Sequence, residues 1–161
     1  MNPEPIVWII GGPNGAGKST SAPYLLRDEY HLMEYVNADT IALGLSSFQP
    51  ETVAFDAGRM MLKRLHDLAE QRVSFAFETT LASRTWAPWI VELREKSYAF
   101  NLLFVWLVSS EMAVQRVQQR VRSGGHHIPE EVVRRRYQRG MRNFHELYRP
   151  IANSWAVYNI P

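Results

Sequence analysis

The apolar residues of this chain form short continuous runs that alternate with longer stretches of helical spacing. The first run, residues 6–10 (Ile-Val-Trp-Ile-Ile), ends at a glycine. Such a run is typical of a strand buried on both faces of a sheet. Similar patterns predict further short strands at residues 34–37, 74–78, 102–108 and 155–159.

Helical patterns separate these strands. Residues 51–72 carry apolar side chains at helical spacing, and helices are also expected at residues 18–29, 85–96, 111–121 and 130–147. Strands that alternate with helices predict a parallel sheet covered on both faces. In such sheets ligands bind beyond the carboxyl ends of the strands, so we expect the chemistry just after Ile10, Asn37, Phe77 and Val108.

The length of 161 residues predicts one domain, residues 1–161, and 46% hydrophobic residues suffice for a core. The absence of cysteine excludes disulfides, thiolate metal sites and a cysteine nucleophile, and it fits a cytoplasmic location. Residues 1–5 lack the pattern of a signal peptide. No stretch approaches the roughly 18 apolar residues of a membrane helix, so we expect no membrane association.

The glycine-rich stretch after the first strand matches the pattern G-x-x-x-x-G-K-[ST], with a strand before it and a helix after it. Glycines let backbone N–H groups wrap a phosphate, and the helix start adds the positive end of its dipole. Lys18 is expected to reach the β- and γ-phosphates of ATP, and the Ser19 hydroxyl to bind Mg²⁺. The predicted nucleotide-binding residues are Gly12, Pro13, Asn14, Gly15, Ala16, Gly17, Lys18, Ser19 and Thr20.

The same string of residues is common in the ATPase domains of ABC transporters. The rest of the chain argues against that class. It contains no Leu-Ser-Gly-Gly-Gln-like signature, and no apolar strand ends in Asp-Glu; the third strand ends in a lone Glu78. A small kinase suits the length and these strand ends better.

Asn37 and Asp39 follow the second strand. A carboxylate at this place would face the γ-phosphate across the sheet edge, where it could orient an acceptor hydroxyl and take its proton. The alternative is that Asp39 caps a helix starting at Thr40.

Glu78, Thr79 and Thr80 follow the third strand. They could bind acceptor hydroxyls, and Glu78 could instead hold a Mg²⁺-bound water. The alternative is turn chemistry, in which Thr80 or Ser83 caps the next helix.

Arginines concentrate in residues 116–149, which hold nine Arg and three Glu and therefore carry +6, whereas the rest of the chain carries −4. Arg116 and Arg120 lie on one helix face, and Gly124 and Gly125 could supply a hinge before Arg134, Arg135 and Arg136. The pattern predicts a lid over about residues 116–136 that closes arginines over the transferred phosphate. A solvated helical face is the alternative. Few aromatic residues are interleaved, which argues against nucleic acid.

These four motifs in order resemble the zeta-toxin-like P-loop kinases, and more closely their small bacterial branch often labelled "predicted ABC-type ATPase". The resemblance spans nearly the whole chain. It implies a P-loop kinase-like three-layer α/β sandwich with a parallel sheet of about five strands and a helical lid. It also implies ATP-dependent phosphorylation of a hydroxyl on a nucleotide sugar such as UDP-N-acetylglucosamine, and an antitoxin protein as a candidate partner.

Carried over by motif, the resemblance implies that Lys18 and Ser19 are the P-loop pair and that Asp39 is the catalytic base. Glu78 and Thr79 match the substrate-contacting stretch, to which the strand-end argument adds Asn37 and Thr80. Arg120 and one of residues 134–136, for which we choose Arg135, match the lid arginines. Two other functions stay open: an ATPase or switch module that acts on a protein partner, and a polynucleotide 5′-hydroxyl kinase.

Overall fold

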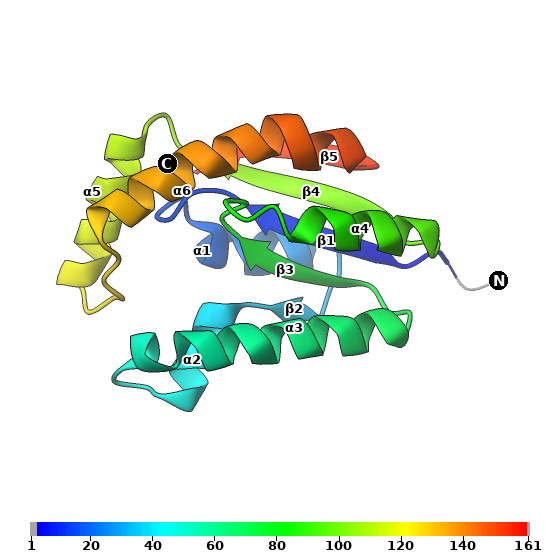
Figure 1. The fold of residues 1–161 in the computed structure, drawn as a ribbon, viewed down its shortest axis with the longest axis horizontal. Helices are drawn as coiled ribbons and strands as arrows, with labels where there is room; N and C mark the ends of the chain where they lie inside the picture. Colours follow the sequence, from blue (N-terminus) through cyan, green and yellow to red (C-terminus); the bar gives the residue numbers. More distant parts are fainter. Residues whose placement is uncertain (1–2, 161) are drawn as a thin grey trace.

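Five parallel strands form the centre of the molecule in the computed structural model, which describes residues 3–160 (Figure 1). Their order across the sheet is β2-β3-β1-β4-β5. The strands are β1 (Ile6–Gly11), β2 (Tyr35–Val36), β3 (Phe75–Thr79), β4 (Ala99–Trp106) and β5 (Ser154–Asn159). Every strand predicted from the apolar runs is present, and only the bounds differ.

Helices lie in all five stretches where the spacing predicts them, and a further helix at residues 38–45 was foreseen only in the alternative in which a helix starts at Thr40. Two of the helices continue into π-helical turns. In the first helix of the chain, the change from α-helical to π-helical turns occurs at Pro23, which has no amide proton to donate to an α-helical hydrogen bond. The helices are α1 (Lys18–Ala22, continued by the π-helical Pro23–Glu29), α2 (Ala38–Leu45), α3 (Ala54–Glu70, preceded by the 3₁₀ turn Pro50–Val53), α4 (Trp86–Glu95), α5 (Ser110–Arg122) and α6 (Glu130–Asn143, continued by the π-helical Phe144–Tyr148 and the 3₁₀ turn Arg149–Ile151).

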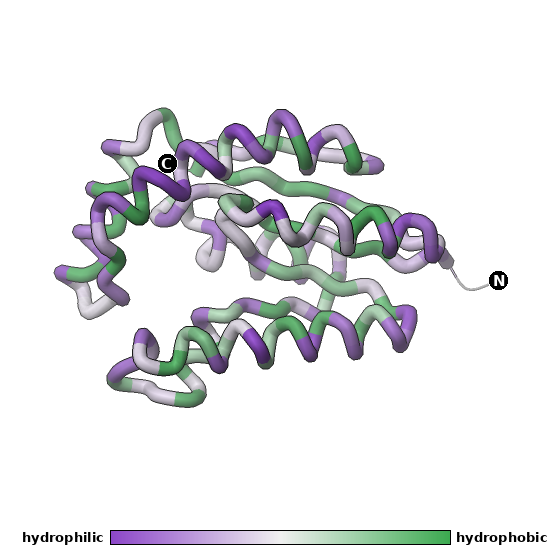
Figure 2. Tube along the Cα trace, in the orientation of Figure 1, coloured by the Kyte–Doolittle hydropathy of each residue, from purple (hydrophilic) through white to green (hydrophobic). Residues whose placement is uncertain are grey.

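Each face of the sheet has its own apolar core. Alternate residues of β1 point to opposite faces, so that Val7 and Ile9 join one core and Trp8 and Ile10 the other. The first core is closed by α3, α4 and the turn after α6, and the second by α1 and α5. In Figure 2 the strands are mostly hydrophobic, whereas α6 is mostly hydrophilic. The predicted three-layer α/β sandwich is therefore confirmed.

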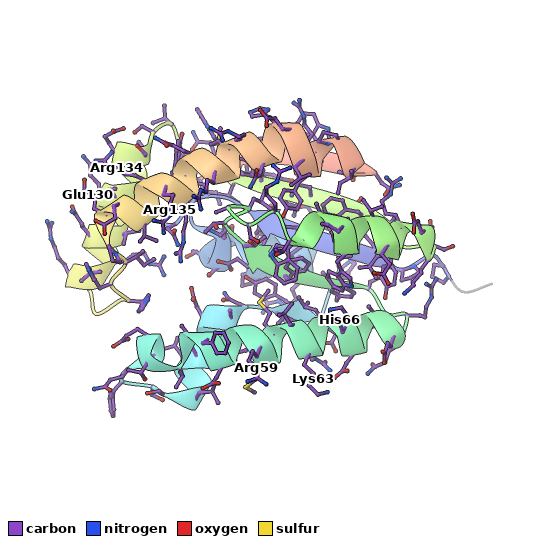
Figure 3. The ribbon with its side chains drawn as sticks, viewed as in Figure 1. Arg59, Lys63, His66, Glu130, Arg134 and Arg135 are labelled. Carbon is purple, nitrogen blue, oxygen red and sulfur yellow. The ribbon has the colours of Figure 1, made fainter. Side chains whose placement is uncertain are left out.

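The outer face of α3 shows how the same helix serves core and solvent. Arg59 and Lys63 point away from the sheet in Figure 3. His66 instead lies on the side facing α4, where its ring is 5.0 Å from that of Trp89.

The strands run in one direction, so their carboxyl ends share one edge, beside α5 and the start of α6 (Figure 1). Val36 pairs with Phe77, which places the next residues, Asn37 and Glu78, side by side at that edge. Residues 1, 2 and 161 of the predicted domain lie outside the described residues.

Among residues 3–160, no helix combines the length and the apolar character that crossing a membrane requires.

Candidate active site

The loop between β1 and α1 depends on its glycines for conformation and for space. Gly12, Gly15 and Gly17 have φ values of 147°, 82° and 93°, in which a side chain is strained. A Cβ on Gly12 would lie 2.2 Å from the carbonyl oxygen of Val105, and one on Gly15 would lie 2.9 Å from the Cβ of Arg116. The loop is therefore held closely against β4 and α5.

Lys18 lies buried under this loop. Its Nζ donates hydrogen bonds to the carbonyl oxygens of Gly12 at 2.7 Å and Pro13 at 2.9 Å. Burial lowers the pKa of Lys18 to about 8, although the nearby carboxylates of Glu78 and Asp39 act in the opposite direction. The amine is thus a desolvated donor with two carbonyl partners, and an anion in the loop would favour its charged form.

Glu78 is the centre of a hydrogen-bonded group at the ends of β2 and β3. Ser19 Oγ lies 3.0 and 2.9 Å from its two carboxylate oxygens, and Asn37 Nδ2 donates to Oε2 at 3.0 Å. The Tyr35 hydroxyl also donates to Oε2. The sequence motifs predicted Ser19, Asn37 and Glu78 for the site but missed Tyr35. The available signal was its spacing of two residues from Asn37, because residues two apart along a strand point to the same side.

Asp39 lies in the first turn of α2 and is exposed to solvent. The helix begins at Ala38, and its cap is Asn37, whose Oδ1 accepts a hydrogen bond from the Asp39 amide at 2.8 Å. The alternative in which Asp39 caps a helix starting at Thr40 is therefore wrong. Since a different residue caps the helix, the Asp39 carboxylate is available to face the phosphate loop.

A cleft of about 800 Å³ runs along the phosphate loop. Asp39 and Glu78 line one part of it, and the C-terminal half of α5 with Ile160 lines another. Arg116 donates from its Nη1 to the carbonyl oxygen of Ile160 at 3.2 Å, which ties α5 to the end of β5. The residues that line the cleft are Asn14, Gly15, Gly17, Lys18, Ser19, Thr20, Asp39, Glu78, Arg116, Gln119, Arg120, Ser123, Gly124, Gly125 and Ile160.

The three consecutive arginines of α6 have different surroundings. Arg136 donates to Asn14 Oδ1 of the phosphate loop at 3.5 Å, and burial lowers its pKa. Arg134 pairs with Glu130 and Glu111 at 2.9 and 2.8 Å, and in Figure 3 it lies with Glu130 and Arg135 at the start of α6. Arg135 is exposed, whereas Arg136 is partly buried, and neither side chain is among the residues that line the cleft. The geometry thus brings Arg136, in place of the chosen Arg135, to the phosphate loop, together with Arg120 from α5.

Gly124 and Gly125 terminate α5. The amide of Gly125 donates to the carbonyl of Arg120 at 2.7 Å, and that of Gly124 donates to the carbonyl of Val121 at 3.0 Å. With Gly124 at φ 88°, these bonds form a Schellman motif, the usual end of a helix at glycine. The glycines expected to act as a hinge are therefore accounted for by helix capping.

The predicted lid, residues 116–136, is the end of α5, a connecting loop and the start of α6. Val117 of α5 and Val133 of α6 are both buried in one apolar core, so this segment packs against the body of the protein. In the loop, His126 Nδ1 lies 3.7 Å from Glu51 Oε2, on the segment that precedes α3.

Thr79 and Thr80 shape the turn after β3. Their hydroxyls accept hydrogen bonds from the amides of Leu81 and Ala82 at 3.2 and 3.3 Å, and Leu81 is buried with φ 63°. The turn-chemistry alternative thus describes these contacts, although neither Thr80 nor Ser83 caps α4. Unlike Glu78, the two threonines do not line the cleft.

The donor set around Ser19 suits magnesium rather than a metal with an all-protein shell. No group of three or more His, Asp or Glu side chains arranged to hold a metal occurs within residues 3–160. Magnesium is usually held by one or two protein oxygens together with phosphate oxygens and water. The Ser19 hydroxyl and the Glu78 carboxylate beside the phosphate loop fit that chemistry.

Comparison with known proteins identifies the family. The zeta toxin family model matches residues 1–158, nearly the whole chain. The protein belongs to the zeta-toxin family. An uncharacterised protein of Haemophilus influenzae is 29% identical to it over 126 residues, covering 78% of this chain and 88% of the relative.

Solved structures agree on the fold of this zeta-toxin relative. A chain of the PezAT toxin–antitoxin system of Streptococcus pneumoniae matches with a TM-score of 0.71 and 17% identity, covering 98% of this chain and 69% of its own length. Shikimate kinase from Acinetobacter baumannii, in complex with shikimate, matches with a TM-score of 0.57 and 18% identity, covering 98% and 85%.

Family membership and the phosphate loop together make the chain a P-loop phosphotransferase that uses ATP. The site must therefore provide a place for the donor phosphates and a place for an acceptor hydroxyl.

Proposed function

We propose that the protein transfers the γ-phosphate of ATP to a hydroxyl of a small acceptor, and that the acceptor is a nucleotide sugar such as UDP-N-acetylglucosamine. The observation that carries the proposal is the place of Asp39. This carboxylate is exposed in the same cleft as Lys18 and close enough to influence its pKa. A carboxylate at this place could orient an acceptor hydroxyl and take its proton.

The donor half of the site consists of the phosphate loop and its cations. With the γ-phosphate directed toward Asp39, the nucleoside would lie toward Arg116 and Ile160, at the other part of the cleft. Lys18 would leave its two carbonyl partners for phosphate oxygens. Arg120 and Arg136 would neutralise charge that develops on the transferred group, which in phosphoryl transfer contributes a large share of the rate.

Ser19 and Glu78 would hold magnesium with the phosphates. Magnesium held there would neutralise part of the phosphate charge. Glu78 accepts a hydrogen bond from the Ser19 hydroxyl, which leaves the lone pairs of Ser19 Oγ free to accept other contacts. This assignment places Glu78 on the magnesium side of the site rather than on the acceptor side.

The acceptor half would lie between Asp39 and the end of β3. Asp39 would accept a hydrogen bond from the acceptor hydroxyl and take its proton as the phosphoryl group leaves ATP. Exposed arginines on α6 would favour an acceptor that itself carries phosphate, as a nucleotide sugar does. The family also suggests an antitoxin protein as partner, since one structural neighbour comes from a toxin–antitoxin system.

An acceptor screen tests this function. The protein is incubated with γ-labelled ATP, magnesium and, in separate reactions, UDP-N-acetylglucosamine, free N-acetylglucosamine, and a short oligonucleotide with a 5′-hydroxyl. We expect label on the nucleotide sugar. Label on the oligonucleotide alone would instead identify a polynucleotide kinase. Phosphate release that is indifferent to every acceptor would support the ATPase alternative and contradict the proposal.

A further inference from the structure

Glu78 receives hydrogen bonds from three side chains that belong to two separate segments. Ser19 comes from the first turn of α1, whereas Tyr35 and Asn37 come from β2 and the residue after it. The two β2-side donors both reach Oε2, and Ser19 Oγ is shared between Oε1 and Oε2. The carboxylate is therefore held in one orientation from both sides.

The direction of the Ser19 proton decides what its oxygen can do. An ionised carboxylate only accepts hydrogen bonds, so the Ser19 hydroxyl must be the donor to Glu78. Asn37 Nδ2 donates to one lone pair of Ser19 Oγ at 3.2 Å. One lone pair remains, and it is the one available to a cation in the cleft. Partners that orient a ligand in this way commonly tune metal affinity.

Tyr35 is the member of this group whose role the reaction itself does not explain. It is not among the residues that line the cleft, so it would touch neither nucleotide nor acceptor. Its ring packs on the apolar core formed by α1, α5 and one face of the sheet. Burial, followed by the charge of Glu78, raises its pKa, so the phenol keeps the proton that it donates.

We propose that Tyr35 is a positioning residue that holds Glu78 against Ser19, and that it thereby sets the affinity of the site for the magnesium–nucleotide complex. Without the phenol, the Glu78 carboxylate keeps Asn37 and Ser19 as partners but loses the donor buried behind it. It can then rotate away from Ser19, and the Ser19 lone pair is no longer fixed toward the cation. The inference rests on the proposed function only in assigning magnesium to the nucleotide site.

The test removes one hydroxyl and measures binding with no acceptor present. Full-length Tyr35→Phe and wild-type protein are titrated calorimetrically with a non-hydrolysable ATP analogue, once with magnesium and once with EDTA. Loss of one hydrogen bond to a charged group should weaken magnesium-dependent binding by about tenfold. Binding in EDTA should change by less than about twofold, because the phosphate loop itself is untouched.

Tyr98→Phe is the matched control. The Tyr98 hydroxyl also donates to a partly buried oxygen, the carbonyl of Val73 at 2.8 Å, but both residues lie at the opposite end of the strands from the site. This variant should alter neither titration. Glu78→Gln should reproduce the magnesium-selective loss, and adding Tyr35→Phe to it should cause little further weakening, because the two changes act through one contact.

Equal weakening with and without magnesium, or no weakening at all, would overturn the proposal. A Tyr35→Phe protein with normal magnesium-dependent binding but a raised KM for the acceptor would also overturn it, because Glu78 would then serve the acceptor. Since the binding assay contains no acceptor, its outcome is separate from that of the acceptor screen.

Discussion

Lys18 provides a pH test of the phosphate site. Burial lowers its pKa to about 8 in the free protein, and its amine contacts two backbone carbonyls. Bound phosphates would stabilise the ammonium form, so ATP should bind the protein with Lys18 charged. When the pH exceeds the free-state pKa, the protein must take up a proton to bind ATP. The affinity for ATP should therefore fall as the pH rises above about 8.

The size of this effect follows from the titration curve. With a pKa of about 8, Lys18 is about three-quarters protonated near pH 7.5 and about 3% protonated near pH 9.5. The dissociation constant should therefore rise by about 25-fold between these values, which is about 2 kcal/mol. The Tyr35 pKa is raised, so that phenol does not titrate in this range. The terminal phosphate of ATP is also fully ionised there.

Calorimetry at the two pH values, in buffers of different ionisation enthalpy, measures both the affinity and the proton uptake. Near pH 9.5, binding should take up close to one proton, because almost all Lys18 is neutral before ATP binds. Lys18→Met should bind ATP weakly but with no pH dependence above pH 8. A wild-type dissociation constant that stays constant from about pH 7.5 to 9.5 would refute this reasoning, as would an equal pH dependence in Lys18→Met.

Two further predictions concern α6. Arg136→Ala should lower kcat by at least about 100-fold in a steady-state phosphotransfer assay, because Arg136 reaches the phosphate loop. The exposed neighbour serves as the control, and Arg135→Ala should change kcat by less than about threefold. Equal losses of kcat in the two variants would contradict this prediction. Asn143→Ala should lower the free energy of unfolding by about 2 kcal/mol in a denaturant titration, because two backbone carbonyls of the turn after β3 lose their buried donor. Arg142 is exposed, so Arg142→Ala serves as the control. If Asn143→Ala had the same free energy of unfolding as this control, the Asn143 side chain would not stabilise the turn.

The phosphate loop was predictable in full because its function depends on local sequence. Glycines at fixed spacing, a lysine and a serine follow a buried strand, and the structure needs Gly12 and Gly15 for both conformation and space. That Asn37 and Glu78 lie at the same edge of the sheet was predictable for a related reason, because parallel strands end at one edge. Their contact, across about forty residues of sequence, also requires that β2 and β3 are neighbours in the sheet, which the sequence pattern did not predict.

Other features depend on packing that the sequence pattern does not encode. Arg135 and Arg136 are neighbours in sequence, but consecutive helix residues point about 100° apart, and only the rotation of α6 on the sheet decides which one faces the loop. The start of β4 was placed three residues too late because Asn101 interrupts the apolar run. In the fold, Asn101 Oδ1 accepts a hydrogen bond from the Ser154 hydroxyl across the strand pair, which satisfies its polarity.

The role of Tyr35 could not be predicted from the sequence pattern. A lone tyrosine in a short strand has no motif of its own, and its link to Glu78 appears only when β2 and β3 lie in register. The same holds for Asn143, which is separated by about sixty residues from the turn that it holds. Such supporting contacts are set by the tertiary structure, whereas the residues that touch phosphate carry recognisable local patterns.

Phosphoryl transfer by Asp39→Asn tests the central claim most directly. The variant keeps the size of the side chain but cannot accept the acceptor's proton as a carboxylate does. With UDP-N-acetylglucosamine, or with whichever acceptor the screen identifies, we predict that transfer from labelled ATP falls by about 1,000-fold or more while the dissociation constant for ATP changes by less than about twofold. Full transfer activity in Asp39→Asn would contradict the assignment of the base and, with it, the proposed acceptor half of the site.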